Sequence, residues 1–223
     1  MERTIKVTGK GKISVKPDTI RIIITQSKVE KTYEGAIRES ADDKEKLSES
    51  FVKIGFAKED LKTLFFNTQT EYEDYETQNG NWRRRLKGYR YTHRMKLEFP
   101  VNNEKLGKVL GAVSKCTGEP EFTIQYTIAD PEGAKNELLA KAIEDSQAKA
   151  AVLSKAAGVE LKAILNIDYS WGEIDFVTRP VNSLMLKECR MIEADGEDNG
   201  INLDIEADDI DVTDIVTVVW EIG

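Results

Sequence analysis

The strand-type and helix-type segments of this sequence do not alternate one for one, and this order restricts the fold more than any single motif does. Alternating, β-branched segments predict strands at 4–15, 19–28, 64–75, 82–99, 121–130, 163–171 and 214–222. Apolar residues at helical spacing predict helices at 33–55, 102–116 and 131–157. Because most strands follow one another directly, the sequence predicts an α+β protein with helices packed on one face of antiparallel sheets.

The order between Ile20 and Asp130 is βαββαβ, which is typical of ferredoxin-like modules. We therefore expect a single unit over 1–223 that contains two lobes. The first is a ferredoxin-like lobe at 18–130, and the second is a smaller α+β lobe that combines 131–223 with the N-terminal strand 1–17. The turn "KPD" at 16–18 predicts that the first two strands form a hairpin, and the second lobe is expected to share the sheet of the first.

The two longer helices each have a face that the sequence assigns to the interior. In the first helix, the apolar residues at helical spacing are Tyr33, Ile37, Ala41, Leu47, Phe51 and Ile54. The long helix begins at Pro131 and ends before Gly158, both of which are typical of helix ends. Its alanine-rich face contains Ala134, Ala142, Ala148, Ala151 and Ala157. That face either packs on the sheet, which we favour, or docks against another subunit.

Composition excludes several classes of protein. The formal net charge of −8 argues against a general nucleic-acid binder, because binding phosphates requires a basic surface. No apolar run approaches the roughly 20 residues of a membrane span, so we expect a soluble protein. As written the chain predicts a cytoplasmic protein, or a periplasmic or extracellular one if a leader was removed. Cys116 and Cys189 are read as two thiols, with a single disulfide bridge as the alternative.

One basic segment, 82–96, interleaves arginine and lysine with aromatic residues, as single-stranded nucleic acid sites do. The preceding segment, 71–76, is acidic, and Asn79-Gly80 predicts a two-residue hairpin turn between the two. That turn would place Glu76 opposite Arg83, Asp74 opposite Arg85 and Tyr72 opposite Lys87. Since the acidic strand would neutralise the basic one, we predict no nucleic-acid partner.

Three motifs suggest chemistry, and each has a simpler interpretation. Residues Asp195–Glu206 fit four of five positions of an EF-hand calcium loop, but a β-branched segment replaces the second helix. His93 is the single histidine, and its alternation with Tyr91 and Met95 favours a half-buried sheet residue over a catalytic one. Gly9-Lys10-Gly11 lacks the third glycine and the helix of a phosphate loop, which favours a twist or bulge. We therefore predict no catalytic, cofactor-binding or metal-ligating residues.

The segments taken together resemble a known family. The start "IKVTGKGKISVKPDTIRI" is similar to the pattern I-x-V-x-G-x-G-x-[IV]-x-V-x-P-D-x-[AI] of the SIMPL-domain family, and similar segments lie at 54–63, 88–99, 122–161 and the C-terminal end. The resemblance implies a bacterial protein of unknown biochemical activity, in some cases linked to the envelope or to oxidative-stress defence. One relative is similar to a ring-forming oligomer. The family has no accepted catalytic residues. This sequence differs from the family pattern at 193–211, where it is acidic.

Two functional hypotheses follow. The first is a non-enzymatic protein that forms a homo-oligomer or binds a protein partner through the edges of its open sheets. The second is a small-molecule or metal-dependent enzyme whose site combines scattered carboxylates and tyrosines.

Overall fold

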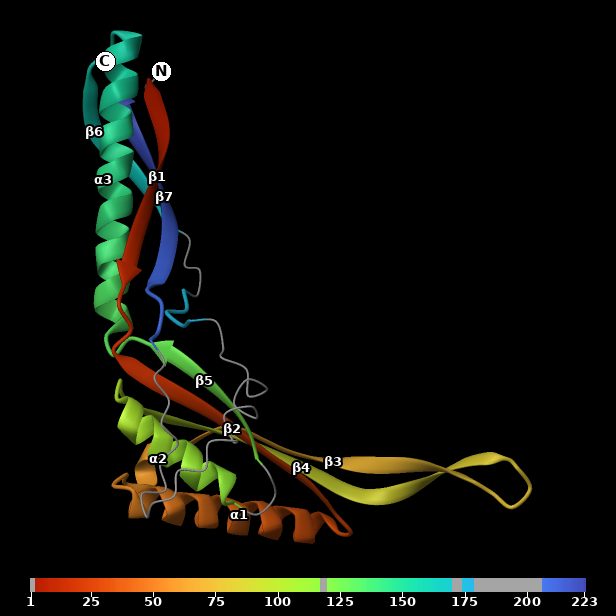
Figure 1. Ribbon diagram of the computed structural model, residues 1–223. Helices are drawn as coiled ribbons and strands as arrows, with labels where there is room; N and C mark the ends of the chain where they lie inside the picture. Colours follow the sequence, from red (N-terminus) through yellow and green to blue (C-terminus); the bar gives the residue numbers. More distant parts are fainter. Residues whose placement is uncertain (1–2, 117–119, 170–173, 179–205) are drawn as a thin grey trace. The chain divides into compact units, whose positions relative to one another are not determined.

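The computed structural model describes residues 3–116, 120–169, 174–178 and 206–223, which form two compact units (Figure 1). The terminal unit contains Met1–Asp18, Thr127–Thr178 and Ala207–Gly223, and the central unit contains Thr19–Tyr126. Each unit has an antiparallel sheet of its own. The predicted α+β class is therefore confirmed, whereas the expectation of one shared sheet is wrong.

The terminal unit has the sheet order β1-β7-β6, with β1 at Thr4–Val15, β7 at Ile210–Ile222 and β6 at Leu161–Asp168. Strands β1 and β7 pair along their whole length, from Thr4 opposite Glu221 to Val15 opposite Ile210. The predicted hairpin between the first two strands is therefore wrong. The last strand is the better partner because its alternating apolar residues pack into the same hydrophobic core as β1. The buried residues of this core are Val7, Ala142, Ala150, Val216, Val218 and Trp220.

Helix α3, Pro131–Ala157, lies along β1 and β7 (Figure 1). The Asp130 side chain accepts a hydrogen bond from the Gly133 N–H at 2.9 Å, and Gly158 ends the helix in the left-handed conformation. The predicted bounds are confirmed. The face that packs on the sheet consists of Leu138, Ala142, Ser146, Ala150 and Ser154. Ala148, Ala151 and Ala157 are exposed, so only part of the alanine-rich face is core.

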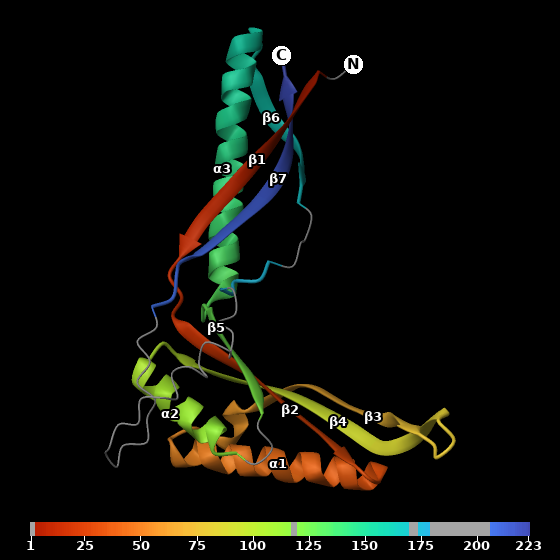
Figure 2. The same ribbon diagram turned by 45° about the vertical axis from the view of Figure 1, so that its right-hand side comes forward.

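The central unit contains β2 (Thr19–Glu30), α1 (Tyr33–Lys53), a short 3-10 helix (Lys58–Asp60), β3 (Lys62–Glu76), β4 (Trp82–Pro100), α2 (Asn103–Ser114) and β5 (Glu121–Thr127). Its sheet order is β3-β4-β2-β5. Helices α1 and α2 pack together on one side of this sheet (Figure 2). The order βαββαβ is present, and the ferredoxin-like assignment stays a prediction.

The buried face of α1 differs from the predicted one. Thr32 caps the start of the helix, and its hydroxyl accepts a hydrogen bond from the Gly35 N–H at 3.0 Å. Tyr33, Ile37 and Ala41 are exposed. The buried residues are Ala36, Ser40, Asp43, Leu47, Ser48 and Phe51. The prediction was wrong in the first half of the helix because it assigned only apolar residues to the buried face. Ser40 and Asp43 are buried there because each has a polar partner on the sheet.

The turn of the β3–β4 hairpin also differs from the prediction. The Gly80 N–H donates to the Thr77 oxygen at 2.9 Å, the Thr77 N–H donates to the Asn81 oxygen at 2.8 Å, and Gly80 has φ 76°. This is a three-residue loop that ends in a left-handed glycine, in place of the two-residue turn. The register therefore shifts by one residue, so that Glu73 lies opposite Arg85.

Candidate functional site

A cluster of buried polar side chains lies between α1 and the sheet of the central unit. We call it the polar cluster, and its buried members are Gln26, Ser40, Asp43, Tyr91 and His93. Thr63, an exposed residue of β3, binds it from the edge. Ser40 and Asp43 come from α1, on the same stripe as Ala36 and Leu47. Tyr91 and His93 lie on β4, two residues apart, so both point to the face that α1 covers.

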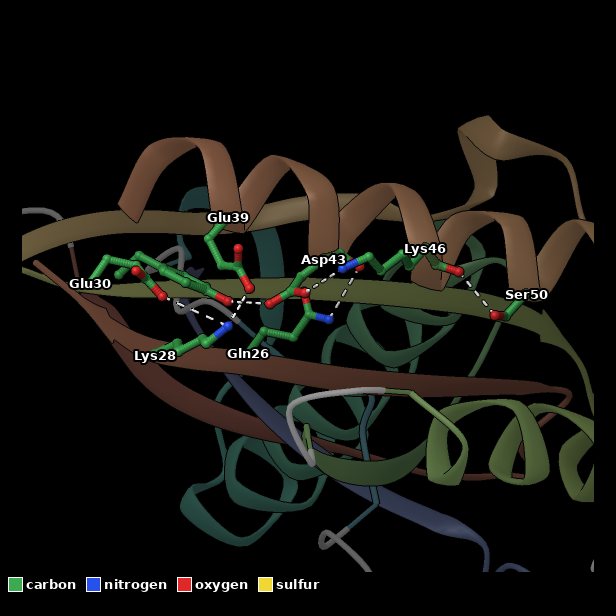
Figure 3. A network of polar contacts seen from close by, with 8 residues as sticks. Gln26, Lys28, Glu30, Glu39, Asp43, Lys46 and Ser50 are labelled. Carbon is green, nitrogen blue, oxygen red and sulfur yellow. Dashed lines mark hydrogen bonds and ion pairs between the residues drawn. The ribbon is translucent and has the colours of Figure 1, made fainter. Parts of the chain in front are cut away.

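Asp43 and Tyr91 form one half of the polar cluster. Figure 3 shows Asp43 on α1 beside Gln26 and Lys46. The Tyr91 hydroxyl donates to Asp43 Oδ2 at 2.5 Å, and Gln26 Nε2 donates to the main-chain oxygen of Asp43 at 3.4 Å. Lys46 Nζ lies 3.7 Å from Asp43 Oδ1. Burial, followed by the hydrogen bond to Asp43, holds the pKa of Tyr91 well above its usual range. Tyr91 therefore stays protonated and acts as a donor to a buried carboxylate.

His93 forms the other half. Its Nδ1 lies 3.1 Å from Ser40 Oγ, and its Nε2 lies 2.9 Å from Thr63 Oγ1. The residue is only 7% exposed, and the Phe66 ring packs edge-on against it. Burial lowers the pKa of His93. Because both ring nitrogens bind hydroxyl groups of this chain, the imidazole holds α1 and β3 to β4. His93 is more deeply buried than the half-buried residue that the sequence predicts.

The exposed end of the cluster is an ion-pair network at the end of β2 (Figure 3). Lys28 Nζ forms an ion pair with Glu39 and lies 3.7 Å from Glu30. The hydrogen bond with Glu39 raises the pKa of Lys28, and the same bond lowers the pKa of Glu39. One ammonium group thus faces two acidic side chains at the rim of the buried group.

Metal-ligating groups do not gather in the part of the chain that the structure describes, where no three His, Cys, Asp or Glu side chains are placed to hold an ion. Cys116 is half-buried, and its Sγ donates to the Ala112 oxygen at 3.4 Å. Burial raises the pKa of this thiol. Cys189, and with it the question of a bridge, lies outside the described residues, as does the acidic stretch 195–206.

Gly9 and Gly11 are explained by close packing of a helix. A Cβ on Gly9 would lie 1.9 Å from the Ala142 oxygen, and one on Gly11 would lie 2.2 Å from the Leu138 oxygen. The pairing of β1 with β7 is continuous through both residues, so the predicted bulge is wrong. The glycines allow the backbone of α3 to approach the backbone of β1.

Side chains of α3 also cover the outer edge of β1. The Lys10 N–H donates to Asp145 Oδ2 at 2.6 Å, and Lys149 Nζ donates to the Thr8 oxygen at 3.4 Å. The hydrogen bonds from Lys149 and from the Lys10 N–H lower the pKa of Asp145. A groove of about 520 Å³ lies beside this edge, lined by Lys6–Thr8 of β1 and by Ala148, Lys149, Val152 and Leu153 of α3. Two backbone groups of β1, the Lys10 N–H and the Thr8 oxygen, are therefore already hydrogen-bonded to α3.

Comparison with known families decides the assignment. The model of the SIMPL family, described as "Protein of unknown function (DUF541)", matches residues 5–220. The chain belongs to the SIMPL family. A search of curated proteins found no match. Among the described residues of this SIMPL protein, no helix has the length and apolar character that a membrane span requires.

Two other edge strands of the SIMPL chain expose large apolar side chains. On β6, the exposed residues are Ile164, Leu165 and Ile167, although two irregularities in its pairing with β7 interrupt the strand. On β3, three consecutive residues, Leu64–Phe66, are 44–49% exposed, and one irregularity in the pairing with β4 lies at Leu64, between Thr63 and Phe65. Runs of three or more exposed apolar residues are unfavourable unless they have a function. We therefore regard the outer edge of β3 as the leading candidate interface.

The sequence prediction named no site residues, so it missed both the polar cluster and the exposed apolar run on β3. The signal for the polar cluster is the spacing of Ser40 and Asp43, which places two polar residues between Ala36 and Leu47 on one helical stripe. The signal for β3 is the run Leu64–Phe66, which does not alternate with polar residues as a half-buried strand does.

Proposed function

We propose that this SIMPL protein is non-enzymatic and acts by self-association through strand edges that its own fold leaves uncovered. The observation that supports this proposal is the exposure of Leu64–Phe66 on β3, which is the edge strand of the central sheet. An exposed apolar edge strand presents unpaired N–H and C=O groups together with a hydrophobic surface, and both favour pairing with another chain.

The hydrogen bonding of the polar cluster supports a structural role for it. Each of its titrating side chains, Asp43, Tyr91 and His93, is buried and bound to another side chain of the same unit. Such networks fix the packing of a core when their donors and acceptors are satisfied. Among the described residues, Gln26 Oε1 is the one buried side-chain atom of the cluster without a hydrogen-bond partner.

Size-exclusion chromatography with light scattering, over a wide range of protein concentration, tests the proposal. We expect a discrete assembly, and we expect Phe65→Lys to reduce its stability because a lysine on an edge strand discourages strand pairing. Val52→Lys is the matched control, since Val52 is a similarly exposed apolar residue on α1. A wild-type protein that stays monomeric at every concentration would contradict the proposal.

The physiological setting that we propose is the bacterial envelope or oxidative-stress defence, on the basis of the family resemblance. Cell fractionation, together with the survival of a deletion strain in peroxide, tests this part independently of the assembly.

A further inference from the structure

The β3–β4 hairpin extends past the end of β2. The last pair between β2 and β4 is Glu30 with Tyr89, and beyond it residues 72–76 of β3 and 82–86 of β4 pair only with each other in the described part of the unit. Glu71 pairs with Gly88, and an irregularity in the register at Lys87 marks the base of the free hairpin. We call residues 71–87 the arm, which is the yellow end of the hairpin in Figure 1. An isolated two-stranded ribbon is marginally stable in water. The arm is therefore a candidate for pairing with another strand.

Both outer edges of the arm carry backbone groups that the hairpin does not use. The Thr77 N–H donates across the hairpin to the Asn81 oxygen. Since successive residues of a strand alternate between inward and outward hydrogen bonding, the N–H groups of Asp74 and Arg84, which lie opposite each other, point outward. One edge belongs to β3 and the other belongs to β4.

The two edges have opposite charge. The β3 side, Glu71–Glu76, has four acidic residues and no basic one, and the β4 side, 82–87, has four basic residues and no acidic one. Within the arm and its base, Glu73 forms an ion pair with Arg85 at 2.6 Å, and Glu71 forms one with Arg90 at 2.8 Å. Among the described residues, Asp74, Glu76, Arg83, Arg84 and Lys87 form no salt bridge, so charge of both signs is left over on the arm.

The hairpin itself shows how the two sequences recognise each other. Besides the ion pair of Arg85 with Glu73, the Arg84 guanidinium lies 4.7 Å from the centre of the Tyr72 ring, and that of Arg85 lies 4.9 Å from the Tyr75 ring. Both are cation–π distances. An acidic, tyrosine-containing strand thus pairs with an arginine-rich strand on the inner side, and each strand offers the same residue types to a strand added on its outer side.

Charge also decides between the two ways of joining copies. A two-fold dimer would pair the β3 edge with itself or the β4 edge with itself, which brings like charges together. We propose that the arms of successive copies pair edge to edge, with the acidic β3 edge of one arm against the basic β4 edge of the next. This inference rests on the proposed self-association and specifies its direction: the contact is head to tail, and it produces a ring if the rotation between copies closes and a filament if it does not.

One face of the arm adds an apolar contribution. Tyr72 lies opposite Leu86, and Glu76 lies opposite Trp82. Both pairs point to the same face of the arm, because side chains alternate along a strand. Trp82 is 70% exposed, and Tyr72 and Leu86 are also exposed. In a row of paired arms these side chains would form a continuous stripe across neighbouring copies.

Two charge-reversal variants test the inference, and both leave the ion pairs of Glu71 and Glu73 intact. The first is Asp74→Lys/Glu76→Lys, and the second is Arg83→Glu/Arg84→Glu/Lys87→Glu. We expect each variant alone to weaken assembly at least about tenfold, because the charges on its two arm edges that lie outside the ion pairs of Glu71 and Glu73 then have the same sign. We expect an equimolar mixture of the two to assemble again, because the basic edges of one then meet the acidic edges of the other. The matched control, Asp42→Lys/Glu49→Lys, reverses two exposed acids of α1 and should assemble like the wild type.

Salt provides a measurement that needs no variant. Raising NaCl from about 0.1 M to about 1 M shortens the Debye length from about 10 Å to about 3 Å, so assembly through the arms should weaken. Assembly that is insensitive to salt, or a mixture of the two folded variants that stays monomeric, would overturn the arm contact and leave the proposed self-association standing. A wild-type protein that never assembles would refute both. Assembly that persists in the variants but is lost in Phe65→Lys would place the interface at Leu64–Phe66.

Discussion

Replacing Gly9 by alanine should strongly destabilise the terminal unit. The new Cβ would lie 1.9 Å from the main-chain oxygen of Ala142 and 2.6 Å from the amide nitrogen of Ser146. Both atoms belong to the backbone of α3, so neither can rotate away, and the helix must retreat by about 1 Å. Overpacking of this kind costs about 1–3 kcal/mol and occasionally more, and we expect the free energy of unfolding to fall by about 3 kcal/mol. Gly11→Ala should behave similarly.

Urea denaturation followed by circular dichroism measures this loss, with Gly158→Ala as the matched control. Gly158 has φ 67° and nothing within 4 Å of its added Cβ, so alanine there bears only the cost of a left-handed backbone, about 1–2 kcal/mol. If Gly9→Ala were no more destabilising than Gly158→Ala, the close approach of α3 to β1 would not be what makes glycine necessary.

Three further predictions concern the central unit. Tyr91→Phe should lower the free energy of unfolding, measured by urea titration, by about 1–3 kcal/mol, because it removes the hydrogen-bond donor to the buried Asp43 side chain. Tyr33→Phe changes an exposed tyrosine and should have little effect in the same titration. The pKa of His93 is lowered in the folded protein, so the unfolded chain binds a proton more readily; stability should fall as pH drops below about 6.5, and His93→Gln should show a smaller fall between pH 7 and pH 5. Equal pH slopes would contradict this. Arg84→Pro removes an outward N–H of the arm and should weaken assembly, measured by light scattering, more than Arg84→Gln does.

Features that depend on local sequence were predictable. The bounds of α3 follow from Asp130, Pro131 and Gly158, which are short-range end signals. The hairpin of β3 and β4 was located correctly, but its register was not, because Asn79-Gly80 fits either a two-residue turn or the last two positions of a three-residue loop. One residue of difference moves every cross-strand pair.

Features that depend on distant partners were not predictable. Ser40 and Asp43 are polar, and only the position of Tyr91 and His93 beneath α1 makes their burial favourable. The pairing of β1 with β7 likewise joins the two ends of the chain, and no turn signal between them exists to indicate it. The exposed run on β3 was visible in the sequence, but its place at the edge of a sheet was not.

The pairing of β1 with β7 has a consequence for the order of events on the ribosome. The helices and strands of the central unit come from one continuous stretch, so that unit can fold while synthesis continues. Strand β1, by contrast, has no partner in its sheet until β7 has been made, and the nascent β1 must be kept from incorrect pairing in the meantime. A chain that ends prematurely, before Ile210, would lose the whole terminal unit while its central unit remains able to fold.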